Sequence, residues 1–210
     1  MKKTGTAIIL CGGKSSRMGF DKSKYEINGK LLIEICAEKL GSVFEEVLLV
    51  TKDPDKFKGL GYKVIGDNAG AYAPVFGIYS GLLEAGSHFS FIIACDMPVI
   101  NLNYIKYLIE KLENESFPPD GLISMNGSFI EPFYSFYSKN MLKKLKYNID
   151  IKNYKITDSI NMCNIEFVNT EIIKKYAGNI DIFTNLNYPC DLEIFSGAFI
   201  KELCLNDKKY

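Results

Sequence analysis

The order of apolar segments along this 210-residue chain constrains its fold most strongly. Short apolar runs, typical of strands that are buried on both faces of a sheet, occur at 7–10, 47–50, 62–65 and 89–94. Apolar residues at helical spacing occupy 31–40, 78–83 and 104–112. Because strands that alternate with helices usually form a parallel sheet, we predict an α/β fold with a mostly parallel central sheet.

The second half of the chain has a less regular pattern. Strands are expected at 122–124 and at 133–137, where the aromatic side chains are interpreted as sheet packing. Over 141–164 the polar content rises, and an ordinary surface helix is preferred there to a mobile segment beside a substrate. Asn101 or Asn103 is expected to cap the preceding helix.

Composition and charge exclude several classes of protein. The length suits one domain, 1–210, which can bury a core without disulfides. Lys+Arg and Asp+Glu both total 25, so no global positive field is available for nucleic acid. The dispersed cysteines and the lone His88 do not have the spacing of a zinc site, and no apolar run reaches membrane-spanning length. We therefore expect a cytoplasmic protein without nucleic-acid or membrane partners.

A glycine-rich loop follows the first apolar run directly. Gly12 and Gly13 can adopt backbone angles that let successive amide N–H groups face a phosphate. Lys14, Arg17 and Lys22 add positive charge in the same loop, which matches a ligand with several negative charges, such as a triphosphate. The spacing fits neither the dinucleotide fingerprint nor the Walker loop. A tight turn after a strand is the alternative interpretation of the two glycines.

Two aspartates also follow predicted strands. Asp96 comes shortly after the run at 89–94 and is expected at the same sheet edge as the glycine loop, where open α/β sheets bind ligands. It is either a ligand of Mg²⁺, which prefers few carboxylates together with phosphate oxygens and water, or a turn or cap residue. Asp67 follows the run at 62–65 and is either a hydrogen-bond acceptor for a ligand or part of a turn.

Further motifs lie in other parts of the chain. The segments are L-C-G-G-K-S-S-R-M-G-F-D-K at 10–22, E-I-N-G-K-L-L-I at 26–33, A-C-D-M-P at 94–98 and F-T-N-L-N-Y-P-C-D-L at 183–192. In this order they resemble the motifs of the molybdenum cofactor guanylyltransferases and their nucleotidyltransferase relatives. The resemblance implies a three-layer, Rossmann-like nucleotidyltransferase domain with helices on both faces of the sheet. It also implies transfer of GMP from GTP to the phosphate of molybdenum-molybdopterin, with Mg²⁺ as cofactor and molybdoenzymes or cofactor-carrier proteins as partners.

The resemblance assigns roles to individual residues. Nucleotide binding falls to Leu10, Cys11, Gly12, Gly13, Lys22, Asp67 and Asp96. The implied catalytic residues are Arg17, Lys22 and Asp96, with the two cations on phosphate oxygens and Asp96 as the ligand of Mg²⁺. Asn185 and Asn187 are weaker candidates for orienting metal or substrate, and ordinary turn asparagines are the alternative.

Three positions depart from the family pattern. Cys11 replaces an alanine of similar size, Thr51 stands where an asparagine is common, and Ala73 replaces a glycine. The last two changes concern recognition of the base, so a related transferase that uses CTP or a sugar- or alcohol-phosphate acceptor is kept as the alternative. A non-catalytic nucleotide-binding protein is a further alternative, against which the presence of both Lys22 and Asp96 argues.

Overall fold

The computed structural model describes residues 3–12, 25–27, 29–67, 73–186 and 191. Within these ranges the main sheet has seven strands in the order β5-β4-β1-β6-β8-β7-β9. The strands are β1 (Thr4–Leu10), β4 (Glu46–Thr51), β5 (Lys63–Gly66), β6 (Phe89–Ala94), β7 (Gly121–Asn126), β8 (Phe129–Ser138) and β9 (Ile165–Val168). Only β8 among them runs antiparallel to its neighbours. The predicted mostly parallel sheet is confirmed, and β2 (Glu26–Ile27) and β3 (Lys30–Leu31) form a small separate hairpin.

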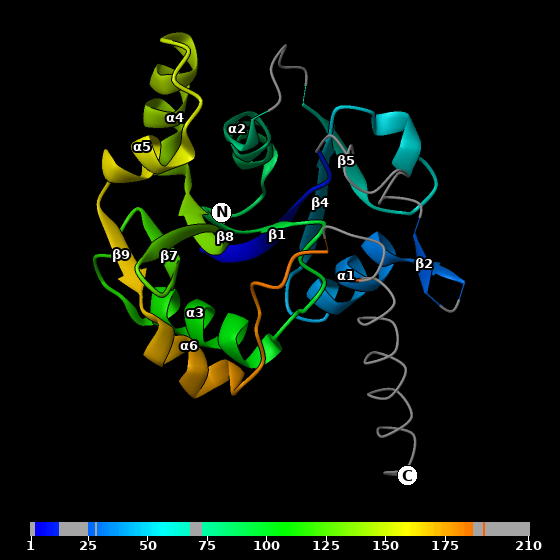
Figure 1. Ribbon diagram of the computed structural model, residues 1–210. Helices are drawn as coiled ribbons and strands as arrows, with labels where there is room; N and C mark the ends of the chain where they lie inside the picture. The colour runs from blue at the N-terminus through cyan, green and yellow to red at the C-terminus, as the bar shows by residue number, and fades with distance from the viewer. Residues whose placement is uncertain (1–2, 13–24, 28, 68–72, 187–190, 192–210) are drawn as a thin grey trace.

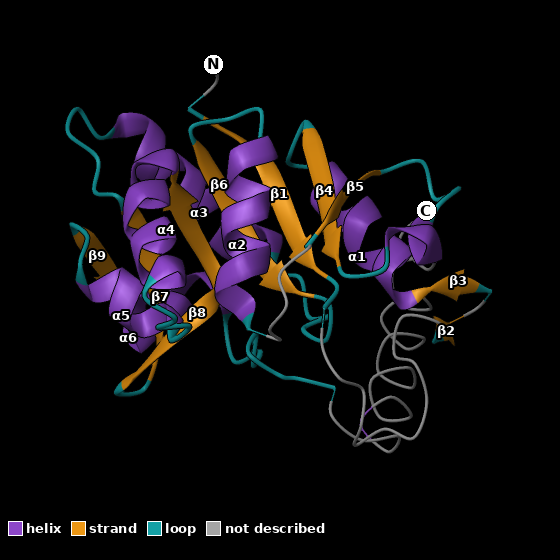
Figure 2. Ribbon diagram, turned by 90° about the horizontal axis from the view of Figure 1, so that it is seen from above, coloured by secondary structure: helices purple, strands orange, loops and turns teal. Residues whose placement is uncertain are grey.

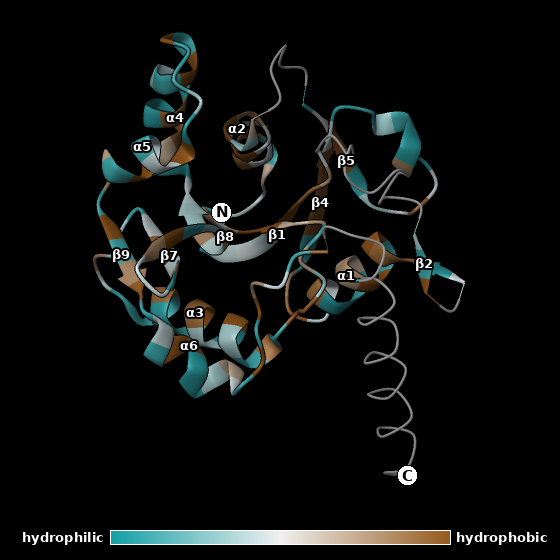
Figure 3. Ribbon diagram, viewed as in Figure 1, coloured by the Kyte–Doolittle hydropathy of each residue, from teal (hydrophilic) through white to brown (hydrophobic). Residues whose placement is uncertain are grey.

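Helices cover both faces of this sheet, as predicted (Figure 1). One face carries α2 (Pro74–Glu84), α4 (Leu142–Asp150) and α5 (Ile156–Asn161), and the other carries α1 (Leu32–Gly41), α3 (Leu102–Asn114) and α6 (Thr170–Ala177). Short 3-10 turns η2 (Pro54–Phe57) and η3 (Lys139–Met141) complete the connections. Figure 3 shows the apolar character gathered in the central strands, which is expected when a sheet is buried between two helical layers.

Each face of the sheet has its own hydrophobic core, because successive side chains of a strand point to opposite faces. Ala7 and Ile9 of β1 pack in the core on the α1 side, whereas Ile8 lies in the core on the α2 side. All three side chains are fully buried. Because successive side chains of a strand point to opposite faces, a strand covered on both faces must be apolar throughout. The uninterrupted run at 7–10 is therefore a direct signal of the three-layer arrangement.

Two glycines bring helix α2 close to β1. A Cβ atom on Gly81 would lie 2.8 Å from Ile8 Cγ2, and one on Gly77 would lie 3.2 Å from Leu10 Cδ2. The helix surface at these positions is backbone, so the strand side chains fill the space that side chains of α2 would otherwise need. Leu83, which was predicted to share the apolar stripe of this helix, is 49% exposed because the glycine side of the helix faces the sheet.

Strand β8 contains a bulge that the sequence pattern did not indicate. Its pairing with β7 shifts between Leu122–Phe136 and Ser124–Glu131. Within the bulge, the fully buried Tyr134 has a φ of 60°, a left-handed conformation that is costly for a bulky residue. The Tyr134 hydroxyl donates to the carbonyl of Val99 at 3.0 Å, which ties the bulge to the segment that follows β6.

The expectations for the second half of the chain are largely confirmed. Asn101 caps α3, because its side-chain oxygen accepts from the Tyr104 N–H at 3.0 Å. Three of the four aromatic rings at 133–137 are core residues: Tyr134, Phe136 and Tyr137 are fully buried, and Phe133 is half-buried. The segment at 141–164 holds two helices where one was expected, and α4 and α5 pack on the sheet through buried residues such as Leu145 and Ile160. It is therefore part of the core on one side and solvated on the other.

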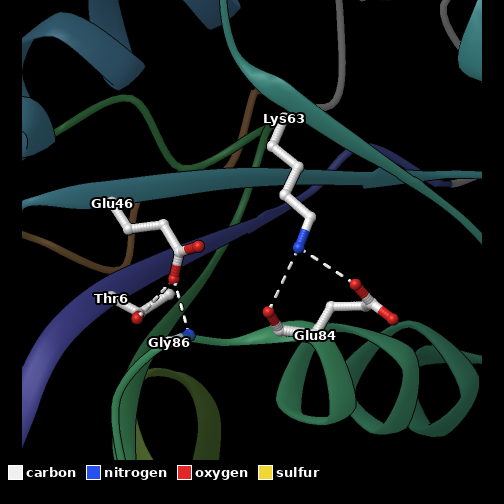
Figure 4. Close-up of polar contacts among 5 residues, drawn as sticks. All are labelled: Thr6, Glu46, Lys63, Glu84 and Gly86. Carbon is white, nitrogen blue, oxygen red and sulfur yellow. Dashed lines mark hydrogen bonds and ion pairs between the residues drawn. The ribbon is translucent and has the colours of Figure 1, made fainter. Parts of the chain in front are cut away.

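Polar contacts hold the amino ends of the strands in place (Figure 4). Glu46 at the start of β4 accepts from the Thr6 hydroxyl at 2.7 Å and from the Gly86 N–H at 2.8 Å. Lys63 at the start of β5 lies 2.9 Å from the Glu84 carboxylate. This edge is thus closed by structural interactions, opposite to the edge where ligands are expected. No helix in the described part of the chain is long and apolar enough to cross a bilayer.

Candidate active site

The carboxyl ends of β5, β4, β1 and β6 share one edge of the sheet, and the arrows of β1 and β4 in Figure 2 show the common direction. Backbone hydrogen bonds continue the ladder past the strand ends: Asp67 N to Thr51 O at 2.7 Å, Cys11 N to Val50 O at 2.7 Å and Cys95 N to Leu10 O at 3.0 Å. Asp96 follows Cys95 directly. The structure therefore brings Cys11 and Asp96 to the same edge, as the sequence predicted, and places Asp67 there as well.

The start of the glycine-rich loop lies in the middle of this edge. Leu10 is buried, Cys11 is half-buried and Gly12 is exposed. No atom of the described residues lies within 4 Å of the position that a Cβ on Gly12 would take, so this turn leaves open space beside the backbone. Gly12 does not adopt a positive φ, so it is the missing side chain and not a special backbone conformation that matters here. Gly13, Lys14, Arg17 and Lys22 lie outside the described residues.

The Asp96 carboxylate stands at the tip of β6, next to the turn that leads into α3. Asp96 is half-buried, and the Met97 N–H donates to Ala94 O at 3.0 Å across the turn. The Asp96 carbonyl accepts from the Leu186 N–H at 2.8 Å. The described residues include no group of three or more His, Cys, Asp or Glu side chains placed to hold a metal ion.

The segment before the end of the chain meets this edge through Leu186. Leu186 is buried with Ile27 of β2 and Leu32 of α1, so its N–H is held against Asp96 by packing as well as by the hydrogen bond. The preceding Asn185 is exposed, and its side-chain amide donates to Phe183 O at 3.1 Å. This local bond is the turn geometry that was the alternative for Asn185, and Asn187 lies outside the described residues.

Glu131 is a carboxylate near this edge that the sequence analysis did not single out. It is half-buried on β8 before the bulge, and its Oε1 accepts from the Phe133 N–H at 3.2 Å. Burial raises the pKa of the Glu131 carboxyl, and the charge of Asp96 raises it further. The placement of Glu131 beside Asp96 depends on the shifted register of β8, which no local sequence signal indicates.

Thr51 and Ala73 are the two departures from the family pattern that concern recognition of the base, and both have simple structural settings. Thr51 is 3% exposed, and its hydroxyl accepts from the Asp53 N–H at 3.2 Å, so it supports the turn after β4. Ala73 precedes α2 with a φ of −145°, an extended conformation that any residue adopts. Alanine therefore introduces no backbone strain at the position where the family has glycine.

An open, mostly parallel sheet with an uncovered glycine turn and half-buried aspartates at its carboxyl edge defines an α/β protein of the nucleotide-binding class. Comparison with known proteins narrows this class. Residues 7–159 match the family described as "MobA-like NTP transferase domain". The chain belongs to this family, and the predicted nucleotidyltransferase resemblance is confirmed.

Relatives and solved structures agree with this assignment. A protein of Peptoclostridium acidaminophilum named "Probable molybdenum cofactor guanylyltransferase" is 37% identical over 93% of this chain and 90% of its own length. The molybdenum cofactor guanylyltransferase of Syntrophotalea carbinolica is 32% identical over 91% of this chain and 90% of its own length. The crystal structure of molybdopterin-guanine dinucleotide biosynthesis protein A from Archaeoglobus fulgidus superposes with a TM-score of 0.79 at 24% identity, covering 93% of this chain and 99% of that one. This likeness confirms the Rossmann-like fold.

Proposed function

We propose that this protein transfers GMP from GTP to the phosphate of molybdenum-molybdopterin, forming a guanine dinucleotide cofactor and pyrophosphate. The observation that carries the proposal is the pairing of Leu10 with Ala94, which brings the turn at Gly12 and the carboxylate of Asp96 to one edge of the sheet. Family membership and the named relatives support the choice of reaction.

The nucleotide would lie across the start of the first loop. We assign its binding to the backbone of Leu10, Cys11 and Gly12, to Gly13 and Lys22 of the same loop, and to Asp67 and Asp96 at the neighbouring strand ends. The Cys11 N–H is already engaged by Val50 O at 2.7 Å. A contact from the Cys11 backbone would therefore be made by its carbonyl, which suits hydrogen-bond donors on a guanine ring.

The chemistry needs positioning and charge stabilisation more than a protein nucleophile. An oxygen of the acceptor phosphate attacks the α-phosphorus of GTP, and pyrophosphate leaves as the bond to the β-phosphate oxygen breaks. Arg17 and Lys22 would stabilise the phosphate oxygens as charge moves to the leaving group, each contributing on the order of 2–4 kcal/mol to lowering the barrier. The acceptor phosphate is already ionised near neutral pH, so no general base is required of this chain.

We assign the Mg²⁺ site to Asp96. Its half-buried carboxylate at a strand tip is a hard oxygen donor, which fits this ion. When bound, Mg²⁺ supplies charge neutralisation to the phosphates. The contribution of Asp96 is to hold the ion at the edge of the sheet beside the first loop.

We treat residues 1–210 as one nucleotidyltransferase domain, because the family match at 7–159 and the strands up to β9 belong to one sheet. Molybdopterin is the proposed second substrate, with molybdoenzymes or cofactor-carrier proteins as recipients of the product. A cytoplasmic location stays a prediction from the sequence.

A nucleotide panel tests the proposed function. The purified protein is incubated with Mg²⁺, molybdenum-molybdopterin and each of the four nucleoside triphosphates in turn, and pyrophosphate release is measured. We expect release with GTP that depends on the acceptor. A preference for CTP would contradict the guanylyl assignment, and binding of GTP without any release would support a non-catalytic nucleotide-binding protein instead.

A further inference from the structure

Cys11 and Cys95 lie side by side at the carboxyl edge of the sheet. β1 and β6 pair in regular register from Thr6 and Ser90 to Leu10 and Ala94, and each cysteine is the next residue along its chain segment. The Cys95 N–H donates to Leu10 O at 3.0 Å, so the parallel register continues to this point. Both cysteines are half-buried free thiols.

The two side chains also point to the same face of the sheet. Ile9 and Ile93, two residues earlier on each strand, belong to the core on the α1 side, and Cys11 and Cys95 both pack against that core. Burial raises the pKa of the Cys11 thiol and the neighbouring Cys95 thiol raises it further, so the two side chains are near enough to influence each other. Adjacent parallel strands are about 4.8 Å apart, which lies within the range of Cα separations of about 4.4–6.8 Å that a disulfide spans, and closing the bond must draw the two Cβ atoms together to about 3.5–4.5 Å.

A third thiol lies behind this pair but differs from it in access. Cys36 of α1 is 2% exposed in the same core, and burial raises the pKa of its thiol to about 12. A thiol that solvent does not reach cannot meet a disulfide in solution, whereas Cys11 and Cys95 are only half-buried. The pair at the edge, Cys11 and Cys95, is therefore the site of exchange, and Cys36 is not.

We propose that Cys11 and Cys95 form a reversible redox site, which low-molecular-weight disulfides such as oxidised glutathione convert to an intramolecular disulfide that weakens nucleotide binding. In the first step one cysteine sulfur, having lost its proton, attacks oxidised glutathione, and one glutathione thiolate leaves. In the second step the other cysteine attacks the mixed disulfide, and the second glutathione thiolate leaves. The protein is oxidised by two electrons, and one oxidised glutathione is reduced to two thiols.

The position of the disulfide explains why oxidation would weaken nucleotide binding. The disulfide would join Cys11, which precedes Gly12, to Cys95, which precedes Asp96. Gly12 and Asp96 both belong to the proposed nucleotide and metal site. At present the Cys11 Sγ contacts Ile9 O at 3.5 Å, so the sulfur must turn from its own strand toward β6. The effect on nucleotide binding rests on the proposed function, whereas formation of the disulfide does not.

The test maps the disulfide and measures binding on the same sample. The full-length native protein is incubated with oxidised glutathione and digested with trypsin without reduction, which places Cys11 in peptide 4–14 and Cys95 in peptide 64–106. Because burial raises the pKa of the Cys11 thiol, exchange is slow at neutral pH, and samples are taken over hours. We expect a cross-link between these two peptides and at least about tenfold weaker binding of a fluorescent GTP analogue. Dithiothreitol should remove the cross-link and restore the binding.

Variants separate this pair from the other cysteines. Cys95→Ala should lose the cross-link and the response to oxidised glutathione, with each variant compared to its own reduced form. Cys163→Ala, which removes a half-buried thiol of the α5–β9 connection, should keep both. The proposal would be overturned if peptides 4–14 and 64–106 stayed unlinked while unfolded protein oxidised, or if the cross-link left the affinity unchanged. If the reduced protein bound no guanine nucleotide, the proposed function would fail, and the peptide map would still decide whether the disulfide forms.

Discussion

The N–H of Leu186 donates a hydrogen bond to the carbonyl of Asp96 at 2.8 Å. Leu186 is buried against Ile27 and Leu32, so the bond is held from both sides. It connects Leu186, within the motif at 183–192, to the tip of β6, although the two residues lie far apart in the sequence. The backbone of the proposed metal ligand is thus fixed by a segment far away in the sequence.

Leu186→Ala tests this link. The substitution removes packing worth about 2–3 kcal/mol locally and loosens the support of Asp96. We expect pyrophosphate release to fall several-fold, while the free energy of global unfolding, measured with urea, falls less than this local figure because Leu186 belongs to a small cluster at the rim. Leu83→Ala, at a position that is 49% exposed, is the control and should change neither quantity much. Unchanged turnover in Leu186→Ala would show that this support does not matter for the reaction.

Asp96→Asn tests the proposed metal ligand. The amide keeps the size of the side chain but removes the charge that would hold Mg²⁺, so we expect turnover to fall by about a hundredfold or more. Binding of GTP in the presence of EDTA, measured by calorimetry, should be largely retained. Asp150→Asn on the exposed end of α4 is the matched control and should behave as the parent protein. Equal loss of turnover in both variants would contradict the assignment.

Gly81→Ala tests the close approach of α2 to β1. The added Cβ would lie 2.8 Å from Ile8 Cγ2 and 3.3 Å from Val50 Cγ2, so the helix must move away from the strand. Overpacking of this kind costs about 1–3 kcal/mol, which exceeds the gain of up to about 1 kcal/mol in helix propensity. We expect a lower free energy of unfolding in urea. Gly41→Ala at the end of α1, where no described atom lies within 4 Å, should be neutral or stabilising.

Glu131→Gln tests the burial of the second carboxylate. The pKa of Glu131 is raised above the ordinary value of 4.5, so the folded state holds the proton more tightly than the unfolded chain. The resulting stabilisation is complete below the unfolded pKa and is lost as the pH rises through the folded pKa. In metal-free buffer, the free energy of unfolding of the variant relative to the parent should therefore increase from acidic to neutral pH. A difference that did not vary with pH would contradict the raised pKa, and Glu110→Gln on the exposed side of α3 is the control.

The arrangement of strands could be predicted from the sequence because it depends on local burial. Strands covered on both faces must be apolar at every position, so the runs around Ile8 and Ile92 stand out without knowledge of their neighbours. The same pattern of strands predicted that the proposed site lies at the carboxyl edge of the sheet. Helices α4 and α5 were harder to place, because each buries only a few residues among many polar ones.

The finer geometry of the site could not be predicted, because it depends on contacts between distant residues. The left-handed backbone of Tyr134 and the register shift of β8 have no local signal, since tyrosine rarely adopts this conformation. The placement of Glu131 beside Asp96 follows from that shift. The hydrogen bond from the Cys11 N–H to Val50 O also depends on the neighbouring strand. Because of this bond, the Cys11 carbonyl and not its N–H is left to contact a ligand.

A crystal structure with a non-hydrolysable GTP analogue and Mn²⁺ in place of Mg²⁺ examines the proposed site most directly. The anomalous signal of manganese locates the ion independently of the nucleotide. We expect the triphosphate beside the turn at Gly12 and the ion bonded to a carboxylate oxygen of Asp96. A nucleotide bound away from this sheet edge, or a metal ion without Asp96 among its ligands, would contradict the proposed site.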